Sequence, residues 1–110
     1  CKGDIENIFT KDELLSNVTL YWVTETIQSS IQLYGESRKT PLHFTKDEFV
    51  KVPVGISRFP FDDPFPPKKY IERGYNIHHW TEMPVGGHFA AMEQPNLLAQ
   101  DIKKFFSSIV

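Results

Sequence analysis

Two polar residues, Asp62 and His88, stand after the two segments of this sequence that favour β-strands. A histidine activates an attacking group when a neighbouring carboxylate fixes its tautomer and stabilises its imidazolium form. In α/β proteins, residues with such roles gather in loops beyond the carboxyl ends of parallel strands. Two adjacent strands joined by one helix would bring these two loops together, so the placement favours a catalytic pair.

Each residue of the pair also fits a plainer interpretation. An aspartate in a loop is commonly a turn former. A histidine after Gly86-Gly87 is often incidental, although the two glycines let the backbone turn tightly there. Asp63 is a rival to Asp62, and its place before Pro64 makes it the better candidate for the turn residue.

The elements that must position the pair follow the order strand, helix, strand, helix. Residues 52–57 form a β-branched run typical of a buried strand, with Pro53 expected at its start. Residues 75–83 alternate as a second strand, and residues 68–73 favour a short helix between the two. Pro95 opens a last helix, whose predicted buried stripe is Leu98, Ile102, Phe105 and Ile109, with Asp101, Lys103 and Lys104 outside it. This order predicts a parallel α/β sheet, although two strands cannot bury both faces of such a sheet alone.

The first third of the chain is predicted to be helical. Thr10 and Glu13 fit a capping box, and Gly35 is expected to stop a helix over residues 17–34. The apolar residues of that helix recur at spacings of three and four and share one stripe: Leu20, Val23, Ile27, Ile31 and Tyr34. A polar connector with Pro41 follows, so we expect a helical region over residues 1–45 and an α/β region over residues 46–110.

Composition and charge narrow the range of partners. The 110 residues carry 12 Lys and Arg against 14 Asp and Glu, a net charge of −2, which disfavours a nucleic-acid groove or an anionic membrane surface. The single cysteine excludes an internal disulfide and a cysteine-rich zinc site. No apolar run reaches the roughly 18 residues of a membrane span. Since the chain opens on Cys1 and not on methionine, we expect it to be an excerpt of a longer protein.

Three separated motifs resemble the microsomal-type epoxide hydrolases of the α/β-hydrolase superfamily, and together they cover nearly the whole chain. Residues 84–95, Pro-Val-Gly-Gly-His-Phe-Ala-Ala-Met-Glu-Gln-Pro, are similar to the histidine loop of that family, and the match continues through residues 97–102. Residues 52–55 and 59–62 resemble its acid loop, and residues 18–24 and 32–36 resemble a helix of its cap domain. Gly-Gly-His alone is common to many α/β-hydrolases, whereas the combination is specific.

The resemblance implies a fold and a set of residue roles. The fold would be the C-terminal portion of an α/β-hydrolase, with its last parallel strands and helices, preceded by the last helix of the cap domain. His88 would be the general base, Asp62 its orienting carboxylate, and Tyr34 a cap tyrosine that donates a hydrogen bond to the epoxide oxygen. Tyr21 is the alternative donor, and an aromatic residue on an apolar stripe, such as Tyr34, also fits a core position.

The implied reaction converts an epoxide to a vicinal diol through an aspartyl-ester intermediate. Its partners would be a small apolar epoxide, water and, as an option, a second copy of the protein; no cofactor or metal is expected. His78 and His79 face opposite sides of a strand and so do not share a metal site. The nucleophile of the family would lie upstream of Cys1, so the 110 residues alone are predicted to be inactive.

The resemblance also suggests a setting in detoxification or aromatic hydrocarbon catabolism. It favours a cytoplasmic location, with membrane association through an N-terminal anchor outside this chain as the alternative. Two other functions stay open. A haloalkane dehalogenase or an esterase would use the same pair, although halide release calls for donors other than Tyr34. A non-catalytic or truncated protein is the third hypothesis, and the presence of both Asp62 and His88 weighs against it.

Overall fold

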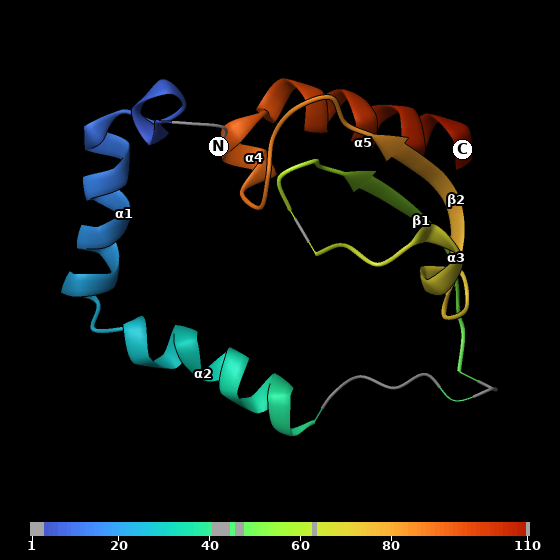
Figure 1. The fold of residues 1–110 in the computed structure, drawn as a ribbon, viewed down its shortest axis with the longest axis horizontal. Helices are drawn as coiled ribbons and strands as arrows, with labels where there is room; N and C mark the ends of the chain where they lie inside the picture. The colour runs from blue at the N-terminus through green and yellow to red at the C-terminus, as the bar shows by residue number, and fades with distance from the viewer. Residues whose placement is uncertain (1–3, 41–44, 46–47, 63, 110) are drawn as a thin grey trace. The chain divides into compact units, whose positions relative to one another are not determined.

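The structure is a computed structural model that describes residues 4–40, 45, 48–62 and 64–109. These residues fall into two compact units, one formed by residues 4–40 and the other by residues 45, 48–62 and 64–109 (Figure 1). The rival aspartate Asp63 and residues 41–44 and 46–47 of the predicted connector, with Pro41 among them, lie outside the described residues.

The first unit contains a short 3-10 helix, η1 (Ile5–Asn7), and two α-helices, α1 (Lys11–Val23) and α2 (Ile27–Lys39). The predicted capping box is confirmed at the start of α1. The Thr10 hydroxyl accepts from the Glu13 N–H at 3.2 Å, and the Glu13 carboxylate accepts from the Thr10 N–H at 2.8 Å. The bond from the Thr10 N–H, followed by the bond from its hydroxyl, lowers the pKa of Glu13.

The prediction of one continuous helix over residues 17–34 is wrong, because α1 and α2 are separate helices. The Thr24 hydroxyl donates to the Leu20 carbonyl at 2.6 Å, and the hydroxyls of Thr24 and Thr26 lie 2.7 Å apart. Glu25 between them takes a left-handed φ of 54°. Side chain–backbone bonds compete with helix continuation, and a left-handed residue is a common helix end.

Gly35 does not stop the second helix, contrary to the prediction. It lies inside α2, which continues to Lys39 and ends where the Thr40 N–H donates to the Glu36 carbonyl at 3.0 Å. A glycine inside a helix costs only about 0.5–1 kcal/mol relative to alanine, so the flanking residues outweigh it. No residue of α1 or α2 is buried, and the predicted apolar stripe is therefore exposed in this unit.

The second unit contains two parallel strands, with helices between and after them: β1 (Val50–Arg58), α3 (Lys68–Ile71), β2 (Tyr75–Glu82), α4 (Ala90–Glu93) and α5 (Pro95–Ile109). The predicted order of strand, helix, strand and helix is confirmed, with α4 as an additional short helix. Pro53 lies inside β1 and not at its start. The strand register shifts between Val50 and Pro53, and such an irregularity accommodates a residue that has no N–H.

Helix α5 packs on both strands (Figure 1). Gly55 of β1 lies under the ring of Phe105, where a Cβ would come within 2.9 Å of the ring, so the missing side chain permits the close approach. The predicted stripe of α5 is only half right. Leu98 and Phe105 are half-buried, whereas Ile102 and Ile109 are 46% and 40% exposed.

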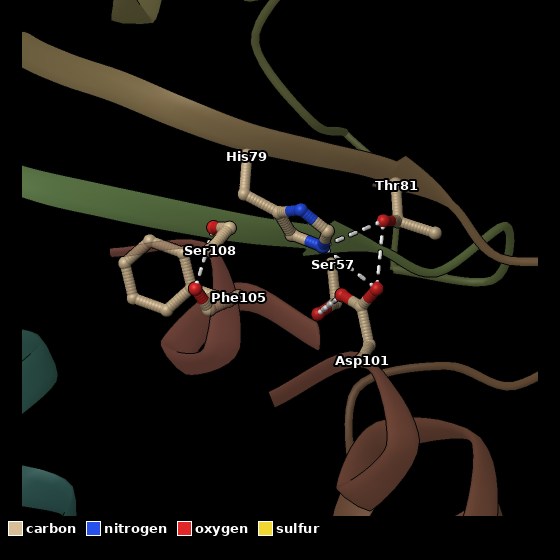
Figure 2. Close-up of polar contacts among 6 residues, drawn as sticks. All are labelled: Ser57, His79, Thr81, Asp101, Phe105 and Ser108. Atoms are coloured by element: carbon tan, nitrogen blue, oxygen red, sulfur yellow. Dashed lines mark hydrogen bonds and ion pairs between the residues drawn. The ribbon is translucent and has the colours of Figure 1, made fainter. Parts of the chain in front are cut away.

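Asp101, which was predicted to lie outside the stripe, is the buried residue of α5. Its two carboxylate oxygens accept hydrogen bonds from the Ser57 hydroxyl of β1 at 2.6 Å and the Thr81 hydroxyl of β2 at 2.7 Å. His79 Nε2 lies 2.8 Å from the same carboxylate (Figure 2). Burying a carboxylate is costly unless it is hydrogen-bonded, and the donors from both strands explain why a charged residue faces the sheet.

The strand β2 presents different residues to its two faces. His79 is half-buried beside α5, whereas the preceding His78 is exposed, as the alternation predicted. Trp80 contacts the chain before and within α3, with its ring 6.0 Å from the Phe65 ring and 5.8 Å from Lys68 Nζ. Within the described ranges, no helix is both long and apolar enough to cross a bilayer.

Candidate active site

Asp62 and His88 meet in the loops that follow the two strands. Nδ1 of His88 lies 2.8 Å from Oδ1 of Asp62. The residues are far apart in sequence, and each stands a few positions beyond the end of its strand, Arg58 for β1 and Glu82 for β2. The predicted convergence of these two residues is therefore observed.

A backbone bridge aligns the two loops immediately before the pair. Phe61 and Gly87 form an isolated parallel bridge, and the Phe61 N–H donates to the Gly86 carbonyl at 3.1 Å. Gly86 has a φ of +107°, a conformation that side chains disfavour. A Cβ on Gly87 would lie 3.1 Å from the Phe61 carbonyl oxygen. The two glycines thus permit the close approach that brings His88 to Asp62.

Each loop starts from a buried residue. Phe59 directly follows β1 and is 6% exposed, and Met83 directly follows β2 and is 8% exposed. The Met83 N–H donates to the Arg58 carbonyl at 2.8 Å, which ties the start of one loop to the end of the other strand. Apolar burial and backbone bonding therefore hold both loops against the sheet end.

The chain beyond His88 is held by its own short helix. The Phe89 N–H donates to the Glu93 carboxylate of α4 at 3.2 Å, and the Phe89 ring stands edge-on to the His88 imidazole at 5.1 Å between centroids. The imidazole thus has a carboxylate on one side and an aromatic ring on another.

The geometry of the pair suits general base chemistry. Because Nδ1 faces the carboxylate, an ionised Asp62 selects the tautomer with its proton on Nδ1 and leaves the lone pair on Nε2. That nitrogen can take a proton from water while the carboxylate stabilises the imidazolium. The side chains of His88 and Asp62 are 68% and 41% exposed, so the pair is open at the surface of this unit.

Tyr34, the third predicted site residue, lies on α2 in the other unit and is 66% exposed. The alternative donor, Tyr21, lies on α1 and is 38% exposed. Both tyrosines are therefore available for contact with a partner group, and the roles assigned to them stay predictions.

The sequence analysis did not predict a second histidine–aspartate pair, in which His79 Nε2 lies 2.8 Å from Asp101 Oδ1. Burial alone would raise the pKa of Asp101, but the hydrogen bonds from Ser57, His79 and Thr81 outweigh it and hold this pKa below its usual value. The sequence does contain a pattern that indicates the burial of Asp101. Asp101 stands three residues after Leu98 in a helix, at a spacing that keeps it near the apolar face.

The sequence of the chain matches named proteins over nearly its whole length. It is 42% identical over 106 residues to epoxide hydrolase 1 of Sus scrofa, covering 94% of this chain and 23% of that relative. It is 40% identical over 106 residues to epoxide hydrolase 1 of Oryctolagus cuniculus, again 94% of this chain and 23% of the relative. Juvenile hormone epoxide hydrolase 2 of Ctenocephalides felis is 38% identical over 110 residues, which is 94% of this chain and 24% of the relative.

The chain is a homologue of the C-terminal part of the epoxide hydrolases. It spans about a quarter of the length of the curated relatives it matches. The resemblance inferred from the three sequence motifs is thereby confirmed. No family model and no solved structure matches the chain.

The described part of the chain holds no group of three or more His, Cys, Asp or Glu side chains that could bind a metal ion.

Proposed function

We propose that this chain is part of an epoxide hydrolase that converts a small apolar epoxide to a vicinal diol, with His88 and Asp62 as its water-activating pair. The observation that carries the proposal is the 2.8 Å contact between His88 Nδ1 and Asp62 Oδ1. The names of the relatives, which are epoxide hydrolases, support the same reaction class.

The reaction would proceed in two steps. An aspartate from a part of the protein outside these 110 residues attacks an epoxide carbon, the carbon–oxygen bond breaks, and Tyr34 protonates the departing oxygen. His88 Nε2 then takes a proton from water, and the resulting hydroxide attacks the carbonyl of the aspartyl ester. The acyl–oxygen bond of the ester breaks, and the departing diol oxygen takes the proton of the attacking hydroxide, which restores the aspartate carboxylate. Asp62 stabilises the imidazolium in between, and the imidazolium proton returns through solvent to the Tyr34 phenolate.

The two steps require different chemical groups, a hydrogen-bond donor in the first and a base in the second. The first step needs a neutral donor near the oxygen where charge develops, which a phenol provides. The second step needs a base with a free nitrogen, which the Nδ1–H tautomer of His88 provides. Loss of His88 should therefore stop the reaction after the ester has formed.

The test is the His88→Gln variant of the full-length protein, with His78→Gln as the matched control. His78 is an exposed histidine of β2 outside the pair. After incubation with styrene oxide, intact-mass spectrometry should find His88→Gln heavier by the mass of one epoxide, whereas His78→Gln should turn over without an adduct. Turnover by His88→Gln at the rate of the wild-type protein would overturn the proposal. Release of chloride from a chloroalkane, without any diol from epoxides, would favour a haloalkane dehalogenase instead.

A further inference from the structure

The buried carboxylate of Asp101 joins three elements of the second unit. It lies on α5, is 4% exposed, and accepts a hydrogen bond from a hydroxyl of each strand, from Ser57 on β1 and from Thr81 on β2. The ring of His79 approaches the same carboxylate from β2, as Figure 2 shows. Because a carboxylate only accepts hydrogen bonds, the nearby His79 Nε2 carries a proton.

The two hydroxyls bound by Asp101 are themselves partners in the sheet. Ser57 and Thr81 face each other in the register of β1 and β2, and each is the next-to-last residue of its strand. The loops that carry Asp62 and His88 start from these two strand ends. Asp101 therefore links the strands at the level from which both site loops depart.

The histidine loop also returns to the element that carries Asp101. After His88 the chain runs through α4 and directly into α5. Asp101 thus closes a ring made of the end of β1, the end of β2, the His88 loop and α5. A displacement of either strand end relative to the other would change the 2.8 Å distance between His88 Nδ1 and Asp62 Oδ1.

Packing alone does not require a charged group at this position. Well-packed apolar residues in place of a buried ionic group are often neutral or stabilising. What the carboxylate adds is directional bonding, because both hydroxyls and the ring must meet its two oxygens at distances of 2.6–2.8 Å.

We propose that Asp101 is a positioning residue, whose carboxylate fixes the register of the two strand ends so that Asp62 and His88 meet at hydrogen-bonding distance. The inference rests on the proposed function for its kinetic consequence. It predicts that Asp101 affects the ester-hydrolysis step, which needs the pair, and spares the ester-forming step, which does not.

The kinetic test compares Asp101→Asn with Glu72→Gln in the full-length protein. Glu72 is an exposed carboxylate of the same unit, 3.7 Å from Lys68 Nζ at the end of α3, and so matches Asp101 in charge but lies outside the ring. In single-turnover measurements, Asp101→Asn should slow ester hydrolysis by about tenfold or more, since small misplacements of catalytic groups have effects of that size. Ester formation should change less than twofold, and Glu72→Gln should leave both rates unchanged.

A second measurement does not depend on turnover. The ¹⁵N chemical shifts of the His88 ring report which nitrogen carries the proton. They should indicate the Nδ1–H tautomer in the wild-type protein and in Glu72→Gln, and a mixture of tautomers in Asp101→Asn. If His88→Gln traps no ester, the proposed function fails, and these shifts still decide the role of Asp101.

Two milder variants test the proposal even if Asp101→Asn does not fold. Ser57→Ala and Thr81→Val each remove one donor to Asp101 and keep the carboxylate. If Asp101→Asn does not fold, the same slowing of ester hydrolysis and the same mixed tautomer are expected, in smaller degree, for Thr81→Val. Wild-type ring shifts in a folded Asp101→Asn or Thr81→Val variant would overturn the proposal, as would equal slowing of both chemical steps.

Discussion

Phe61 and Gly87 pair in an isolated parallel bridge, and each directly precedes one member of the Asp62–His88 pair. The bridge continues the parallel alignment of β1 and β2 into the loops beyond the sheet. The side chains of Asp62 and His88 therefore leave two backbones that run side by side, which accounts for their contact.

Replacing Gly86 by alanine should destabilise the second unit. The φ of Gly86 is +107°, and an added Cβ would stand 2.7 Å from the Phe59 ring and 2.9 Å from Gln94 Cγ. Strained backbone positions of this kind cost about 1–3 kcal/mol. We expect a loss of that size in the free energy of unfolding, measured by chemical denaturation of the full-length protein.

Gly35→Ala is the control for Gly86→Ala. Gly35 lies inside α2 and a Cβ there meets nothing within 4 Å. Alanine should therefore stabilise the helix by about 0.5–1 kcal/mol. Equal effects of the two substitutions would contradict the role given to the Gly86 conformation.

Tyr34→Phe should slow the opening of the epoxide. If the phenol donates to the developing alkoxide, its removal is expected to lower the rate of ester formation by about 10². Tyr70→Phe, on α3 and 63% exposed, is the matched control and should have no effect. The measurement is the single-turnover rate of adduct formation, and a wild-type rate for Tyr34→Phe would transfer the role to Tyr21.

Stability of the second unit should fall in acid partly because of Asp101. Its pKa is lowered in the folded protein, so its carboxylate contributes stability above the unfolded pKa of about 3.9, and that contribution is lost as the pH falls through the folded pKa. The hydrogen bonds from Ser57, His79 and Thr81 outweigh the opposing effect of burial. Chemical denaturation at several pH values between 5 and 2, chosen to bracket about 3.9, measures the free energy of unfolding. This free energy should decrease less with falling pH for Asp101→Asn than for the wild-type protein. Parallel declines would refute this prediction.

The 110-residue chain on its own should neither turn over epoxides nor unfold cooperatively. It exposes large apolar side chains, among them Trp22 at 82% and Val23 at 69%, and the sheet formed by its described residues has two strands. The assay compares diol formation and thermal unfolding of the isolated chain with those of the full-length protein. A cooperative transition with well-dispersed NMR signals would show that the chain folds independently.

Local features were predictable from residues close in sequence. The Thr10–Glu13 capping box involves a spacing of three, and Pro95 marks the start of α5 because its ring suits a first helical turn. The break between α1 and α2 was missed although it is also local. The apolar spacing from Leu20 to Tyr34 indicated one helix, and the hydroxyl bonds around Thr24 outweighed that pattern.

The sequence by itself determined the order of strand, helix, strand and helix in the second unit, the resemblance to the epoxide hydrolases and the choice of Asp62 and His88 as candidates. Only the tertiary structure decided that these two residues lie 2.8 Å apart and that Asp101 faces the sheet. The physical reason is the same in both cases. Hydrogen bonds between residues 20 to 44 positions apart depend on how the strands pair and where the helix packs, and helical or strand periodicity does not encode that pairing.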